Sequence, residues 1–120
     1  MMQKTIQYLP MVFLGGGLGA SLRFFLTIMM NHFTKRLWAG TLTVNVLGCL
    51  IMFLGIKFAS FHVKEFNYFM KIGFLGSLTT FSAFSFEIVD LLKTGRFGEA
   101  IAVFLLNIFF GIFIGIWVLR

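Results

Sequence analysis

The sequence predicts an all-α membrane protein with four transmembrane helices. Hydrophobic residues make up 59% of its 120 residues and charged residues only 12%, whereas an average soluble domain is about half apolar and about a quarter charged. Four apolar runs are each long enough for a helix of about 20 residues, the length that crosses a bilayer. The links between them are short, so residues 1–120 are expected to form a single transmembrane unit.

Each run is interrupted by few charges or none. The first contains only Arg23, the second and fourth are uncharged, and the third carries Glu87 and Asp90 near its end. The predicted spans are Leu9 to Met30, Leu37 to Ile56, Ile72 to Leu92 and Ala100 to Leu119. The predicted links are a turn with Lys35 and Arg36, a longer segment from Lys57 to Lys71, and a turn around Lys93, Gly95 and Arg96. No cleavage pattern follows the first run, so we expect the first helix to be retained.

The positive charges lie mostly between the apolar runs. With a net charge of +6, phospholipid headgroups are the expected counterions, and no nucleic-acid partner is expected. Cys49 has no second cysteine to pair with, so a disulfide is excluded and a small buried hydrophobic role is expected.

Four spans place both termini on one side of the membrane. That side carries Lys4, Lys57, Lys64, Lys71 and Arg120. The other side carries Lys35, Arg36, Lys93 and Arg96, with Arg23 added if it reaches that way. Under the positive-inside rule, the difference in positive charge between the two sides of the membrane sets the orientation of the chain. Here that difference is close to zero. Either some charges are assigned to the wrong side, or the chain inserts in both orientations and the two orientations pair.

Two polar features lie in the first half of the chain. The first span contains a glycine-rich run, residues 15–21, which favours close helix packing, followed by Arg23. A guanidinium does not lose its charge, so Arg23 either extends to the membrane surface or attracts anions in a vestibule. In the second span, Thr41 and Asn45 share a helix face. The Asn45 amide either ties helices together or serves as a donor to a ligand.

The third span is the most informative. Its segment 73–87 places Gly, Ser and Thr in mid-membrane, where they can break a helix. Unwound backbone carbonyls are tolerated there only when they are buried or face a cavity, and they commonly bind a cation. Phe81 and Phe84, three apart, can present the positive edges of their rings to a small anion, with Ser82 and Ser85 beside them as donors. Core packing is the alternative role for the two rings.

Three motifs resemble the CrcB/Fluc family of fluoride channels. They are Gly-Leu-Gly-Ala-Ser-Leu-Arg (17–23), Gly-Thr-Leu-Thr-Val-Asn-Val-Leu-Gly (40–48) and Gly-Phe-Leu-Gly-Ser-Leu-Thr-Thr-Phe-Ser-Ala-Phe-Ser (73–85). The resemblance covers all four spans in order, and the third motif is the most specific. It implies an antiparallel, dual-topology homodimer with a broken third helix, two fluoride pores and one central sodium ion.

The same resemblance implies roles for individual residues. Phe81 and Phe84 correspond to the pore phenylalanines, and Asn45 to the pore asparagine. The backbone carbonyls of Gly76 and Thr79 correspond to the sodium ligands. The remaining implied positions are Thr41, Thr80 and Ser82 as polar residues beside the pore, Asn107 as a looser match on the fourth span, Arg23 in the vestibule, and Glu87 as an acid at the pore mouth.

The predicted function is passive fluoride efflux across the plasma or inner membrane of a prokaryote, without enzymatic chemistry. A fluoride pore must replace the ion's water with donors without trapping the ion, and neutral amides, hydroxyls and ring edges suit this task. One alternative is a drug–proton antiporter resembling the small multidrug resistance transporters. These require an acid in the middle of the first helix, where this chain has Arg23. Another alternative is a non-transporting subunit of a membrane assembly.

Overall fold

The computed structural model describes residues 5–58 and 61–120, and this part of the chain contains helices and no strands. Its elements are α2 (Leu9–Thr34), α3 (Leu37–Lys57), α4 (Lys64–Asn67), the π-helix η1 (Tyr68–Leu75), α5 (Gly76–Leu78), α6 (Phe81–Lys93) and α7 (Phe97–Val118). Four helical stretches are long and apolar enough to cross a membrane, the third running from Lys64 to Lys93. The prediction of an all-helical protein with four spans is therefore confirmed.

The predicted link from Lys57 to Lys71 is wrong in its second half. The chain is helical again from Lys64, through α4 and η1, so the third span begins eight residues before the predicted Ile72. The charges of Lys64 and Lys71 concealed this start. A helix satisfies its own backbone hydrogen bonds, so it can continue through the membrane surface, where long basic side chains reach water.

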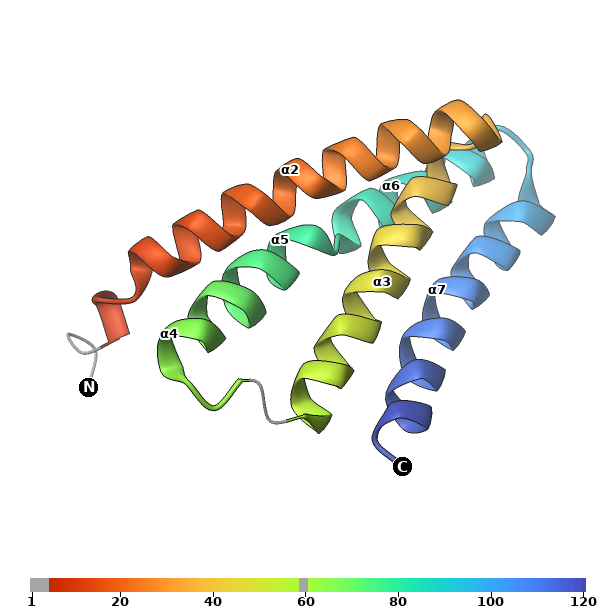
Figure 1. The fold of residues 1–120 in the computed structure, drawn as a ribbon. Coiled ribbons are helices and arrows are strands. Elements are labelled where there is room, and N and C mark those ends of the chain that lie inside the picture. Colours follow the sequence, from red (N-terminus) through yellow and green to blue (C-terminus); the bar gives the residue numbers. More distant parts are fainter. Residues whose placement is uncertain (1–4, 59–60) are drawn as a thin grey trace.

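Each of the four spans packs against at least two of the others (Figure 1). Helix α2 lies along η1 and α5, and α3 packs against both α2 and α7. Helix α6 packs against α7. The α2–α3 turn and the α6–α7 turn meet at one end of the molecule, and the start of α2 and the end of α7 lie at the other end. Both described chain ends therefore lie on the same side, as four crossings require.

Glycines allow α2 to approach the third span closely. A Cβ atom placed on Gly15 would lie 2.1 Å from the carbonyl oxygen of Phe69, and one on Gly19 would lie 2.1 Å from that of Phe74. On the third span, a Cβ on Gly73 of η1 would lie 2.6 Å from the carbonyl oxygen of Val12 in α2. Helix association in lipid depends on such close backbone packing, so these glycines fix the position of the third span against α2.

The buried core of the single chain is small. One cluster consists of Val44, Leu75 and Leu78, and a second consists of Leu91, Ala100 and Val103. Most of the large apolar side chains are exposed on the outer surface of the helices. Such a surface is stable only against lipid or another protein, in agreement with a membrane location.

Candidate functional site

The third span contains a short non-helical segment in its middle. Helix α5 ends at Leu78 and α6 begins at Phe81. Between them, Thr79 (φ −82°, ψ 153°) and Thr80 (φ −148°, ψ 120°) have extended backbone conformations. An extended segment within a membrane leaves backbone groups that need other partners, and a side chain of α3 supplies them.

That side chain is Asn45, whose amide lies opposite Thr80. Its Oδ1 atom accepts the backbone N–H of Thr80 at 2.8 Å, and its Nδ2 atom donates to the Thr80 carbonyl oxygen at 3.3 Å. The same Nδ2 atom also donates to Oδ1 of Asn107 on α7 at 3.0 Å. Asn45 thus connects three spans through one amide. This is the helix-tying role that the sequence analysis left open.

The start of α6 is capped by Thr80. Its hydroxyl oxygen accepts the backbone N–H of Ala83 at 3.2 Å and lies 3.2 Å from the Ser82 hydroxyl oxygen. A threonine in an extended conformation immediately before a helix is a favourable N-cap, because its side chain satisfies a free N–H of the first turn. The capping residue and the amide of Asn45 together account for the extended backbone at this point.

These two interactions leave two carbonyl groups without their helical donors. In a continuous α-helix, the Gly76 carbonyl would accept from the N–H of Thr80, and the Thr79 carbonyl would accept from the N–H of Ala83. The first N–H donates to Asn45 and the second to the Thr80 hydroxyl. Gly76 is also exposed on the surface of the single chain. Among the described residues, neither carbonyl oxygen therefore has the donor that a continuous α-helix would give it.

A groove of about 270 Å³ lies on one side of Thr80. Its lining residues are Asn45, Cys49, Thr79, Thr80, Phe81, Phe84, Asn107 and Ile108. The rings of Phe81 and Phe84 are 5.7 Å apart between centroids. Phe84 is 6% exposed and stacks on Phe104, whereas Phe81 is 76% exposed. One ring is thus fixed inside the subunit and the other projects from it.

A second groove, of about 520 Å³, lies on the other side of Thr80. Its lining residues are Ala20, Arg23, Phe24, Thr27, Thr41, Thr80, Ser82, Ala83, Phe86 and Glu87. The half-buried Arg23 supplies a fixed positive charge, and the hydroxyl groups of Thr27, Thr41, Thr80 and Ser82 line the same groove. Thr80 belongs to both grooves. The structure therefore brings most of the residues named from sequence together in two adjacent grooves, with Gly76 and Ser85 outside both.

Glu87 is buried, at 9% exposure, and pairs with Thr41. The Thr41 hydroxyl donates to Oε1 of Glu87 at 2.5 Å. The other oxygen, Oε2, is buried and has no hydrogen-bond partner in the described part of the chain. Sequence reasoning named both residues but did not connect them, since they are 46 positions apart. In the sequence, the one indication that Glu87 requires a partner is that this acid lies within an apolar span.

Asn107 lines the groove that contains the two phenylalanines and lies between its own helix and Asn45. Its Nδ2 atom donates to the Val103 carbonyl oxygen of its own helix at 3.0 Å, while its Oδ1 accepts from Asn45. One of the two N–H donors of this amide is thus used within its own helix. Its observed contact with the interrupted segment runs through Asn45.

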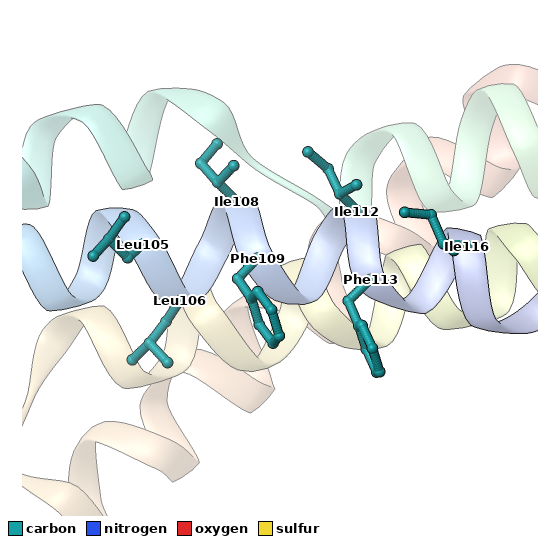
Figure 2. A pocket seen from close by; sticks show the side chains of 7 residues that line it. All are labelled: Leu105, Leu106, Ile108, Phe109, Ile112, Phe113 and Ile116. Carbon is teal, nitrogen blue, oxygen red and sulfur yellow. The ribbon is translucent and has the colours of Figure 1, made fainter.

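A third groove, of about 550 Å³, follows the outer face of α7 and is lined only by apolar side chains. Figure 2 shows them: Leu105, Leu106, Ile108, Phe109, Ile112, Phe113 and Ile116. With no polar side chain, this groove cannot replace the water of an ion. Within residues 5–58 and 61–120 there is also no group of three His, Cys, Asp or Glu side chains that could hold a metal ion. The two grooves beside Thr80 are therefore the candidate site.

The chain is similar to proteins of one known family. Residues 10–118 match the family described as "CrcB-like protein, Camphor Resistance (CrcB)". The chain is 42% identical over 108 residues to the "Fluoride-specific ion channel FluC" proteins of Salmonella arizonae, Salmonella paratyphi B and Salmonella newport. Each alignment covers 86% of this chain and 84% of the relative. These relatives carry the name of an ion channel, not of an enzyme.

Proposed function

Because the chain belongs to the CrcB family, we propose that it is a subunit of a fluoride-selective channel that lets fluoride leave the cell passively. The observation that carries the proposal is the meeting of two grooves at Thr80. One groove begins at a cation, Arg23, and the other contains the phenylalanine pair. Together they provide a polar route along α6 through the middle of the membrane.

The groups in the two grooves suit a small, strongly hydrated anion. Arg23 lines the second groove and can raise the local anion concentration there. The hydroxyls of Thr80 and Ser82 supply neutral donors, and the edges of Phe81 and Phe84 supply weak positive potential. A route without a fixed cation at its narrowest part binds the ion loosely enough to release it.

We further propose that two copies assemble antiparallel. A single chain leaves Phe81 76% exposed and the apolar face of α7 uncovered. A second copy would cover such surfaces and close each groove into a pore, giving two pores per dimer. The near balance of positive charge between the two ends of the spans supports insertion in both orientations, which an antiparallel homodimer requires.

The interrupted third span fits a structural sodium ion at the dimer axis. The Gly76 and Thr79 carbonyl oxygens lack their helical donors, and oxygen atoms suit a hard cation. Two oxygens from each subunit would give four ligands. In this proposal the ion fixes the two broken helices against each other, and the fluoride route runs beside it.

A growth experiment tests the proposed function. Bacterial cells that lack their own fluoride exporter are transformed with this chain or with an empty vector and are grown on increasing fluoride concentrations. The chain should permit growth at fluoride concentrations that stop the control cells, with no effect on chloride tolerance. Equal sensitivity of the two strains, with the protein present in the membrane, would overturn the proposal.

A further inference from the structure

Glu99, in the first turn of α7, holds three side chains at the end of the molecule where the two turns meet. Its Oε1 atom accepts from Arg36 Nη1 at 2.5 Å and from Trp38 Nε1 at 2.6 Å. Its Oε2 atom accepts from Arg96 Nη2 at 2.5 Å. One carboxylate therefore fixes the α2–α3 turn, the start of α3 and the α6–α7 turn together.

A pocket of about 190 Å³ adjoins this cluster. Its lining residues are Lys35, Arg36, Leu37, Trp38, Phe86, Glu87, Asp90, Leu91 and Arg96. All three side chains held by Glu99 are among them. Phe86 and Glu87 also line the groove that contains Arg23. The pocket thus adjoins the proposed fluoride route at these two side chains.

The pocket is also lined by acidic side chains that would attract Arg36 and Arg96 if Glu99 did not bind them. Asp90 and Glu87 line the same pocket, and Glu87 has a buried oxygen without a hydrogen-bond partner among the described residues. In that part of the chain, neither Arg36 nor Arg96 forms an ion pair with these two acids. A guanidinium released from Glu99 would have two carboxylates within the pocket to bind, and binding there would place it across the pocket.

We propose that this pocket is one mouth of the fluoride route, and that Glu99 is a positioning residue that keeps the mouth open. It does so by holding Arg36 and Arg96 at the rim, away from Asp90 and Glu87. Held there, the two cations still attract anions to the opening. This inference rests on the proposed function.

The substitution E99Q tests the proposal because positioning and simple electrostatics predict opposite changes in the rate of fluoride efflux. It removes one negative charge, so electrostatics alone would raise fluoride entry at low ionic strength. Release of the arginines into the mouth should instead lower the rate of fluoride efflux from liposomes by about tenfold or more, the lower limit of the effect that charged clefts have on ion entry. E65Q makes the same charge change in α4, on the third span before η1, and should leave efflux unchanged.

A second substitution tests the cause of the loss. E99Q/R96Q restores the wild-type net charge and removes one of the two released guanidiniums, so efflux should recover in part. A loss caused by general destabilisation would not recover when a further member of the cluster is removed. Should E99Q fail to form the dimer on size exclusion, E99D keeps the charge with a shorter reach, and it should show the same loss and the same rescue by R96Q.

The outcomes are distinct. Efflux in E99Q that equals or exceeds that of E65Q, or a loss that R96Q does not reverse, would overturn the assignment of Glu99. Absence of fluoride efflux in the wild-type protein would instead overturn the proposed function, before any variant is compared.

Discussion

The side-chain amide of Asn45 forms hydrogen bonds with the backbone of Thr80 in place of those that a continuous helix would supply. It accepts the backbone N–H of Thr80 at 2.8 Å and donates to the carbonyl oxygen of the same residue at 3.3 Å. Without this amide, the N–H of Thr80 would have the Gly76 carbonyl as its nearest helical partner, and the third span could continue as one helix. The extended segment and the free carbonyl oxygens of the candidate site thus depend on one residue of a different span.

Replacing Asn45 by Ala should therefore disrupt the site more than it destabilises the fold. The loss leaves a partly buried backbone N–H unsatisfied, at a cost of about 1–3 kcal/mol, which favours closure of the helix. We expect fluoride efflux to fall at least tenfold, corresponding to about 1.4 kcal/mol at the barrier. The matched control is Asn31→Ala, at the end of α2 and outside both grooves. Wild-type efflux in Asn45→Ala would contradict the role given to this amide.

The glycines of α2 give a prediction about stability. Gly19→Ala would place a methyl group 2.1 Å from the Phe74 carbonyl oxygen, so α2 and the third span would have to separate. Overpacking of this kind costs about 1–3 kcal/mol. Gly17→Ala is the control on the same helix, because no atom lies within 4 Å of the added group. Thermal unfolding in detergent should show a lower Tm for Gly19→Ala than for Gly17→Ala, and equal Tm values would contradict the packing shown here.

The sequence predicted the number and order of the transmembrane spans more accurately than the residues at which they begin and end. The starts at Leu9 and Leu37 agree with the structure, since each follows or opens an apolar run. The third span was placed too late because Lys64 and Lys71 resemble a link in composition. Charge alone does not distinguish a loop from a helix that continues to the membrane surface, and the π-helical turns of η1 leave no clear periodic pattern.

At the site, motifs identified the residues but not their partners. Asn45 was named from its motif, yet its bond to Asn107 joins residues 62 positions apart. Such a pair depends on the register of α3 against α7, which is set by packing and not by any local pattern. The same holds for Glu99 and Trp38, 61 positions apart. Sequence reasoning did not single out either residue, because each alone looks like an ordinary residue at a helix start.

The balanced charges give a prediction about insertion. Topology reporters fused to the C-terminus should report both sides of the membrane in comparable amounts. Adding three lysines to the α2–α3 turn should then shift the population toward the orientation with that turn inside, because positive residues near short spans are retained in the cytoplasm. A wild-type chain that inserts in only one orientation would contradict the charge argument and the antiparallel dimer.

The two phenylalanines should respond differently to replacement by Ile. Phe84 packs on Phe104 within the subunit, so Phe84→Ile should lower stability by up to about 1.5 kcal/mol. The exposed Phe81 makes less packing contact, so Phe81→Ile should leave the Tm nearly unchanged.

Both replacements should nevertheless slow fluoride strongly, because Ile keeps the bulk of the side chain but lacks the positive ring edge. A loss of about 3 kcal/mol at the barrier reduces throughput by more than a hundredfold. Phe13→Ile, on an exposed face of α2 outside both grooves, is the control and should keep wild-type efflux. Near wild-type efflux from both folded groove variants would show that the rings serve packing alone.

The most direct test of the account is anion efflux from liposomes that contain the purified wild-type protein. Liposomes are loaded with potassium fluoride or potassium chloride, valinomycin balances the charge, and the released anion is followed with an ion-selective electrode. The account predicts rapid fluoride release that depends on the protein, and chloride release no faster than from protein-free liposomes. Fluoride release at the protein-free rate, or equal release of both anions, would contradict it.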